Sequence, residues 1–412
     1  MRLPIVKETY KKLMDDERIK YAFEMMKSDH EKTVADQITI TEIPAPPFKE
    51  STRAEYYRQR LIDLDLEDVQ MDAEGNVFGI IPGTGTGPKL FVSAHLDTVF
   101  PEGTDTTVKE KDGILYAPGI GDDTRGLAEV LSIIRALKSS QVPNIGDIII
   151  GGTVGEEGAG NLRGVKAFFH NHKVDGYISI DGPNMNAITY LGTGSYRYKI
   201  TYKGPGGHSF ADFGSPSAIH GLGRAIAEIA ELQTKEYPKT TFSVGEVKGG
   251  SSVNAIAEEA SMTVDLRSNN QQELADLDQL FLDIVKKACR DENNRWGSDQ
   301  LTVEIERFGN RPSAHQSEND SIVQTAWAAI ESAGGTPRLA GPSSTDANYP
   351  MSLGIPAITT GTGGRAGGAH TLAEWYDPEN GYMAVQKSVM LILGLVGVKD
   401  VCDPLLSVMS EN

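Results

Sequence analysis

The sequence has few cysteines and no long apolar run, and both absences limit where the protein is expected to function. Its 412 residues include two cysteines, Cys289 and Cys402, so no disulfide framework is indicated and a reducing compartment is expected. No run of about 18 apolar residues occurs, which argues against a transmembrane helix. Charged residues interrupt every short apolar run near the N-terminus, unlike a signal peptide. We therefore expect a cytoplasmic protein.

Basic residues are outnumbered by acidic ones. The chain has 39 Lys and Arg against 57 Asp and Glu, which gives a formal net charge of -18. A field of this sign repels nucleic acid and anionic membranes, so neither is an expected partner. Part of the carboxylate excess is available for metal binding, and the length suggests two or three domains.

Short apolar segments alternate with helical patterns over much of the chain. Strands are predicted at 89–95, 147–154, 176–181 and 356–361, and their nearly continuous apolar character is typical of strands covered on both faces. Between the first two, Leu127, Val130, Leu131, Ile134 and Leu137 recur at helical spacing. This alternation predicts an α/β fold with a mostly parallel sheet flanked by helices.

Residues 195–308 follow another pattern. Strand and helix signals appear in the order β-α-β-β-α-β, the layout of a small ferredoxin-like α+β domain. Segments of the first type resume after about residue 310. We therefore expect a catalytic domain made of residues 1–193 and 311–412, with residues 194–310 inserted as a second domain.

Polar residues stand where the predicted strands end. They are His95, Asp122, Glu156, Glu157, Asp181 and His370. In open α/β sheets, ligands bind at the carboxyl ends of the strands, so separate segments deliver these side chains to one edge. Two adjacent acids after a strand repel each other unless a cation or proton intervenes. Together the residues predict a metal site.

Each residue alone has a simpler explanation. Asp122 with Asp123 is typical of a helix N-terminus, and Asp181 with Gly182 is typical of a turn. The combination suits a metal pair better, because zinc takes His nitrogen and carboxylate oxygen, and a bridging carboxylate can hold two ions. Asp97 could accept the second imidazole N–H of His95, and an unliganded acid could act as general base.

The candidate residues lie in a series of short motifs: SAHLDTV, GIGDDTRG, TVGEEG, SIDG, GPGGHS, GGSSVNAI with VDLRS, SSTDAN and GGAHTLAEW. In these motifs the chain resembles the M20 family of co-catalytic zinc metallopeptidases, which includes peptidase T, carboxypeptidase G2 and several deacylases. The motifs extend from residue 93 to 375. One departure lies after Asp122 and Asp123, where many members have Lys and this chain has Thr124 and Arg125.

The resemblance implies a role for each candidate residue. It assigns one zinc to His95 and Asp181, the other to Glu157 and His370, and the bridge to Asp122. By the same resemblance Asp97 positions His95, Glu156 is the general base, and the peptide bond after Asp122 is cis. Two zinc ions per subunit are expected, with cobalt or manganese as substitutes.

The inserted domain, which the resemblance identifies as a lid or dimerisation domain, supplies three further candidates. His208 resembles the histidine that helps to stabilise the oxyanion, and in dimeric members it comes from the neighbouring subunit. Asn254 and Arg267 resemble residues near the substrate's carboxylate or backbone. A surface arginine at the end of a strand is the alternative for Arg267. A homodimer through this domain is thus one expectation.

The expected reaction is hydrolysis of an amide bond in a small substrate. The amino-acid sequences of the motifs are most similar to the peptidase T-like branch, so they favour a di- or tripeptidase or an aminopeptidase. The alternative within the family is an N-acyl amino acid deacylase. A rival of another class is a non-catalytic relative that binds a ligand in the same cleft, although such a relative would be expected to lose the base or a ligand.

Overall fold

The computed structural model describes residues 3–409 and forms two compact units. The first unit combines Met1–Gly192 with His315–Asn412, and the second is Thr193–Ala314. Each is stabilised by its own buried apolar cluster. Within residues 3–409, no helix is both long and apolar enough to cross a bilayer.

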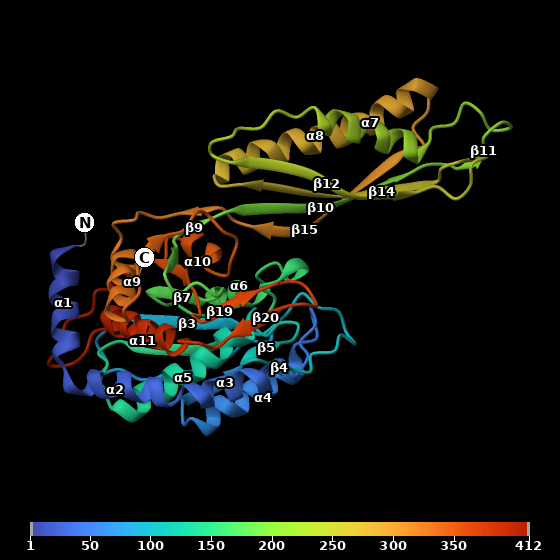
Figure 1. Ribbon diagram of the computed structural model, residues 1–412. Helices are drawn as coiled ribbons and strands as arrows, with labels where there is room; N and C mark the ends of the chain where they lie inside the picture. Colours follow the sequence, from blue (N-terminus) through green and yellow to red (C-terminus); the bar gives the residue numbers. More distant parts are fainter. Residues whose placement is uncertain (1–2, 410–412) are drawn as a thin grey trace. The chain divides into compact units, whose positions relative to one another are not determined.

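The first unit is built on an eight-stranded sheet with the order β1-β2-β6-β3-β7-β18-β8-β17 (Figure 1). The strands are β1 (Glu67–Met71), β2 (Val77–Ile81), β3 (Lys89–His95), β6 (Asp147–Thr153), β7 (Gly176–Ile180), β8 (Ala187–Thr189), β17 (Arg338–Leu339) and β18 (Ala357–Thr360). The central strands β6, β3, β7 and β18 run parallel. The predicted mostly parallel sheet is confirmed, and its central carboxyl ends share one edge.

Helices cover this sheet. They are α1 (Pro4–Asp15), α2 (Glu17–Ser28), α3 (His30–Thr41), α4 (Ser51–Asp63), α5 (Thr124–Ser140), α6 (Arg163–Asn171), α9 (Ser321–Ser332), α10 (Asn348–Ser352) and α11 (Tyr382–Val396), with a 3-10 turn at Gly158–Gly160. The apolar stripe predicted from Leu127 to Leu137 lies on α5 and is buried. On the other face, Phe168 of α6 stacks on Phe91 of β3, with ring centroids 3.7 Å apart. Burial on both faces explains why the strands are apolar throughout.

Two separate helices lie near the N-terminus. α1 ends at Asp15 and α2 begins at Glu17, so the two are separated at Asp16. The Asp16 side chain accepts the main-chain N–H of Arg18, at 2.9 Å, and caps the start of α2. A capping bond of this kind favours a new helix start over continuation.

A small sheet with the order β19-β20-β5-β4 carries a loop of the candidate site. Its strands are β4 (Lys109–Lys111), β5 (Ile114–Tyr116), β19 (Arg365–Gly367) and β20 (Trp375–Asp377), all paired antiparallel. The hairpin between β19 and β20 contains His370. The sheet therefore fixes both ends of the segment that presents this histidine.

The second unit has the predicted β-α-β-β-α-β order. Its main elements are β10 (Gly194–Lys203), α7 (Ala218–Ala230), β12 (Thr240–Gly249), β14 (Glu259–Ser268), α8 (Gln271–Trp296) and β15 (Thr302–Arg311). The sheet order is β12-β14-β10-β15, and every pair is antiparallel. Ser217 is the N-cap residue of α7 and directly follows Pro216.

Short strands complete the two units. They are β11 (Gly207–His208), which pairs with β13 (Ala255–Ile256), and β9 (Leu191–Gly192), which pairs with β16 (Ala314–His315). The first pair lies at one end of the second unit (Figure 1) and contains one of the sequence-predicted site residues, His208.

Candidate metal centre

His95 is the last residue of β3 and is buried at the shared carboxyl edge. Its Nδ1 lies 2.9 Å from the Asp97 carbonyl oxygen, which can only accept a hydrogen bond. Nδ1 is therefore the donor, and in the neutral ring Nε2 keeps its lone pair. That Nε2 lies 3.0 Å from Oδ1 of Asp122. The ring is thus oriented with its ligating nitrogen toward the acid cluster.

Asp122 lies between two histidines. Its Oδ1 faces Nε2 of His95, and its Oδ2 lies 3.1 Å from Nε2 of His370. The peptide bond between Asp122 and Asp123 is cis, as the resemblance implied. The two carboxylate oxygens thus point at two different imidazoles, which is the arrangement that a bridging ligand requires.

Asp123 is a buried neighbour that sequence reasoning left without a role. Its Oδ2 accepts the main-chain N–H of His95 at 3.0 Å, and its Oδ1 accepts that of Gly126 at 3.2 Å. Ligand atoms of Asp123, His95 and Asp181 lie within 4.8 Å of one another. Because both Asp123 oxygens hold main-chain donors, we interpret it as a group that orients His95 and begins α5.

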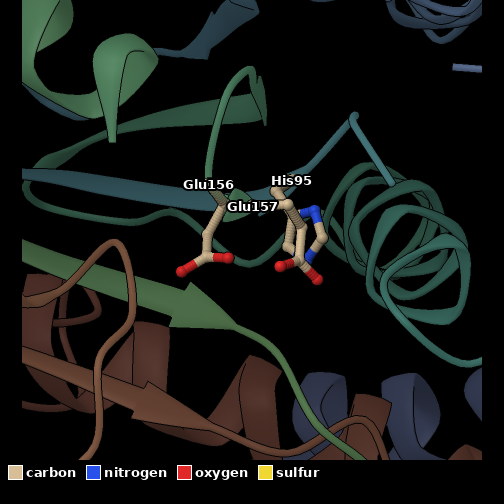
Figure 2. A group of neighbouring side chains, drawn as sticks. All are labelled: His95, Glu156 and Glu157. Carbon is tan, nitrogen blue, oxygen red and sulfur yellow. The ribbon is translucent and has the colours of Figure 1, made fainter. Parts of the chain in front are cut away.

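Glu156 and Glu157 follow β6 and are both buried. Figure 2 shows them beside His95, and ligand atoms of the three residues lie within 4.8 Å of one another. Oε1 of Glu157 is 2.8 Å from Nε2 of His370. Burial raises the pKa of the Glu157 carboxyl, and the negative charge of Asp122 raises it further. An acid in this position gains from a nearby cation.

Asp97 connects the His95 segment to the two glutamates. Its carboxylate accepts the main-chain N–H groups of Glu156, at 3.1 Å, and Glu157, at 2.9 Å. It also lies 3.7 Å from Nδ1 of His95. Burial acts to raise its pKa, but the hydrogen bond and charge of His95 keep the pKa below its ordinary value. This buried carboxylate therefore fixes the turn after β6.

Asp181 follows β7, and its main-chain N–H donates to the Thr360 carbonyl at 3.0 Å. Burial, reinforced by the charge of Asp122, raises its pKa to about 7. His370 is half exposed in the β19–β20 hairpin, and its hydrogen bond to Asp122 raises its pKa to about 9. The crowded acids are stabilised by positive charge, which imidazole protons supply when no metal is bound. A divalent metal ion can take the place of those protons and bind the neutral imidazole nitrogens together with the carboxylate oxygens, so it fits this donor set.

Glu374 is a residue of this site that sequence reasoning did not identify. It is 1% exposed and accepts the main-chain N–H groups of Gly119, Gly121 and Asp122. Glu374 lies four residues after His370 in the motif GGAHTLAEW. The sequence signal that could have identified it is an acidic residue directly before an apolar strand. Its carboxylate joins the loop of His370 to the loop of Asp122.

His208 and Asn254 are neighbours in the second unit, where His208 pairs with Ala255 between β11 and β13. Nδ1 of His208 accepts the main-chain N–H groups of Phe210 and Ala211, at 3.2 and 3.3 Å. The neutral ring therefore carries its proton on Nε2. The imidazole is exposed and offers one N–H donor.

Arg267 lies near the other end of β14 from these two residues. The eight residue-to-residue steps from Glu259 to Arg267 span roughly 26 Å of strand. Nε of Arg267 donates to Oδ2 of Asp265 at 2.6 Å, and Nε of Arg197 donates to Oδ1 at 3.1 Å. Burial and the neighbouring charge of Arg311 lower the pKa of Arg197. Two arginines thus bind one aspartate, and the charge of Arg311 acts on one of them, which makes this a cationic site in an acidic chain.

Comparison with known proteins identifies the family and proteins of similar fold. A sequence model described as peptidase family M20/M25/M40 matches residues 91–393. A tripeptidase from Staphylococcus aureus has the same fold, with a TM-score of 0.73 and 22% identity over 88% of this chain and 97% of that chain. YxeP from Bacillus subtilis, described as a dinuclear metal binding peptidase, has a TM-score of 0.68 and 19% identity over 90% of this chain and 99% of its own.

The sequence is also similar to a deacylase. It is 26% identical over 250 residues to the succinyl-diaminopimelate desuccinylase of Nitrosococcus oceani. The matched region covers 56% of this chain and 66% of that enzyme. The chain therefore spans just under two thirds of the length of this curated relative. The named activities of these proteins include both peptide and acyl-amide hydrolysis.

Proposed function

This chain is an enzyme that belongs to peptidase family M20/M25/M40, and from that premise we propose that it hydrolyses an amide bond of small peptides with two zinc ions and Glu156 as general base. The observation that carries the proposal is the position of Asp122. Its two carboxylate oxygens face the Nε2 atoms of His95 and His370, at 3.0 and 3.1 Å. A carboxylate shared by two imidazoles is suited to bridge two metal ions.

Five side chains would hold the metals. His95 and Asp181 would bind one ion, Glu157 and His370 the other, and Asp122 both. When bound, such a pair supplies a lowered pKa for water and polarises the substrate carbonyl. Zinc is proposed because the donors are imidazole nitrogens and carboxylate oxygens, with cobalt or manganese as substitutes.

Glu156 lies in the group formed with His95 and Glu157, but we do not assign it as a metal ligand. Its main-chain N–H is held by Asp97, and its side chain is buried beside His95. We assign it the transfer of a proton from the attacking water to the departing amine. Asp97 is assigned a positioning role, because it holds the main chain of both Glu156 and Glu157.

Groups of the second unit are proposed to bind the rest of the substrate. The Nε2–H of His208 is available as a donor to the developing oxyanion. Asn254 lies beside it and serves as a second polar contact. Arg267, held at Nε by Asp265, has its terminal nitrogens to offer to a substrate carboxylate.

The separation within the second unit supports a homodimer. His208 lies beyond the Glu259 end of β14 and Arg267 lies near the other end, and the strand from Glu259 to Arg267 spans roughly 26 Å. One unit therefore cannot bring both to the same small substrate. We propose that His208 acts in the site of a partner subunit while the insertion serves as the dimerisation domain.

A deacylase remains the second candidate function, because a succinyl-amide hydrolase is among the similar sequences. Zinc-loaded protein should be assayed against dipeptides, tripeptides and N-acyl amino acids, with Glu156→Gln as the test of mechanism. The variant is expected to keep its metal and lose at least about 100-fold in kcat/KM. Glu110→Gln, at an exposed position on β4, is the matched control. Unchanged turnover by Glu156→Gln would contradict the assignment.

A further inference from the structure

A pocket of about 220 Å³ opens beside Asp181, entirely within the first unit. Its walls come from the segment after β7, from β8, from the loop before α10 and from the end of β18. The lining residues are Asp181, Gly182, Pro183, Asn184, Ala187, Thr189, Ser343, Thr345, Thr359 and Gly361. The pocket therefore adjoins the candidate metal cluster. Of its lining residues, only Asp181 has a role in the function proposed above.

The lining is small and almost without charge. Asp181 is the one ionisable side chain among the described residues that line the pocket, and its carboxylate lies within the cluster that contains His95 and Asp123. The hydroxyl groups of Thr345 and Thr359 bond to each other at 2.6 Å. The walls thus offer neither a cation for an acidic substrate group nor a free anion for a basic one.

The pocket is limited in size by main-chain contacts. A Cβ atom on Gly361 would lie 2.4 Å from the Asn184 main chain, so the two segments touch and close one wall. Across the other side, Thr189 of β8 is paired with Thr359 of β18. The volume is below the roughly 300–1,000 Å³ of pockets that enclose a drug-sized ligand. It therefore suits one side chain or one short acyl group.

We propose that this pocket receives the uncharged side chain or acyl group on the carbonyl side of the scissile amide bond. The proposal rests on the proposed function, since that function places the reacting carbonyl at the metals that Asp181 helps to hold. A charged group in this pocket would lose hydration without gaining a partner. The enzyme therefore selects small or medium apolar and neutral groups, and rejects succinyl, glutamyl and lysyl groups at this position.

The test is a panel of X-Gly-Gly tripeptides, in which X is Ala, Leu, Met, Glu or Lys, together with acetyl-alanine and succinyl-alanine. The free α-amine is common to all the tripeptides, so only the side chain differs. Wild-type enzyme is expected to show at least about 100-fold lower kcat/KM for Glu and Lys than for Leu or Met.

Two variants then change the pocket in opposite ways. Ser343→Arg places a cation at an exposed edge of the lining, and it is expected to raise kcat/KM for the Glu and succinyl substrates at least about 10-fold relative to Leu. Thr336→Arg adds the same charge at an exposed position outside the lining and should leave the ratio unchanged. Ala187→Leu fills the pocket, so Leu and Met substrates should lose rate while Ala is spared.

The outcomes separate the pocket from the proposed function. If zinc-loaded wild type hydrolyses none of the panel, the proposed function fails and the pocket assignment fails with it. If it hydrolyses Glu and Lys substrates as well as Leu, or if Ser343→Arg and Thr336→Arg give the same ratio, the pocket assignment alone is overturned. Because Ser343 is exposed, this comparison is independent of whether Ala187→Leu folds.

Discussion

The carboxylate of Glu374 accepts the main-chain N–H of Asp122 at 2.9 Å, although the two residues are 252 positions apart. The same Oε1 accepts the N–H of Gly121 at 2.8 Å, and Oε2 accepts that of Gly119 at 2.7 Å. Glu374 follows His370 within one hairpin. The segments that present Asp122 and His370 are therefore fixed to each other without any contribution from a metal.

Replacing Glu374 with Gln is expected to weaken metal binding. The amide keeps one acceptor oxygen for three donors and places an NH₂ group against a main-chain N–H. We expect zinc affinity to fall about 10- to 100-fold and metal-free stability to fall by about 1–3 kcal/mol. Competition with a chromophoric chelator gives the first value, and urea unfolding gives the second.

A matched control is Asp72→Asn. Oδ1 of Asp72 likewise accepts three main-chain N–H groups, from Glu74, Gly75 and Asn76, each at 2.9 Å. It bonds to none of the candidate ligands. An equal loss of zinc affinity in both variants would show that the effect of Glu374→Gln is general destabilisation.

Asp97→Asn should affect the site through the turn after β6. Asparagine offers one acceptor to the two N–H groups of Glu156 and Glu157 and removes the negative charge near His95. We expect zinc affinity to fall about 10- to 100-fold, with a corresponding loss of kcat/KM. Asp175→Asn is the control, because Asp175 accepts the main-chain N–H of Lys89 at the start of β3, the strand that ends at His95. Equal losses would exclude a specific role for Asp97.

Metal removal is expected to destabilise the first unit. Without a cation, the carboxylates of Asp122, Glu157 and Asp181 face one another at close range. Zinc at about 100 times its Kd should add about 2.7 kcal/mol of stability by mass action. Thermal unfolding with zinc and with EDTA measures the difference. His370→Ala should reduce the gain, and an identical Tm with and without zinc would contradict the candidate centre.

A buried lysine gives a pH dependence outside the candidate site. Lys387 donates to Oγ1 of Thr360 and to the Gly361 carbonyl, and burial lowers its pKa from 10.5 to about 8. Below pH 8 the folded protein holds Lys387 as a buried ammonium, and the full desolvation penalty lowers the free energy of unfolding. Between pH 8 and 10.5 the unfolded chain binds more protons than the folded one, so stability rises with pH.

The variant Lys387→Met removes this dependence. The unfolding free energy of wild type minus that of the variant should increase by roughly 3 kcal/mol between pH 8 and 10.5. Urea unfolding at several pH values checks this, with Lys11→Met on the exposed side of α1 as the control for loss of a positive charge. A difference that stays constant over this range would exclude the explanation.

The proposed shared site can be tested by mixing two inactive variants. If His208 acts in trans, a mixed dimer of His208→Ala and Glu156→Gln contains one complete site. Random reassociation makes half of the dimers mixed, so about a quarter of wild-type activity should return. No recovery after verified subunit exchange would contradict action in trans, and a monomeric wild type with full activity would exclude it as well.

The strand ends and the inserted β-α-β-β-α-β order could be predicted because both depend on local patterns. Apolar runs such as 89–95 and the stripe on α5 identify their elements without tertiary information. The contacts of Glu374 could not be predicted, because a buried acid can accept main-chain donors from any segment that the fold brings near. The separation of α1 from α2 likewise depends on one contact, the capping bond that the Asp16 side chain accepts from the main-chain N–H of Arg18.

The candidate ligands are distributed from residue 95 to residue 370, and the second unit lies between them in the chain. A growing polypeptide that has released His95, Asp122, Glu157 and Asp181 still has to produce the whole insertion before His370 and Glu374 emerge. The acids of the centre are therefore without their last imidazole while nearly half of the chain, from Asp181 to His370, is synthesised. Hydrolytic competence is thus acquired late in synthesis, after the inserted unit has had time to fold.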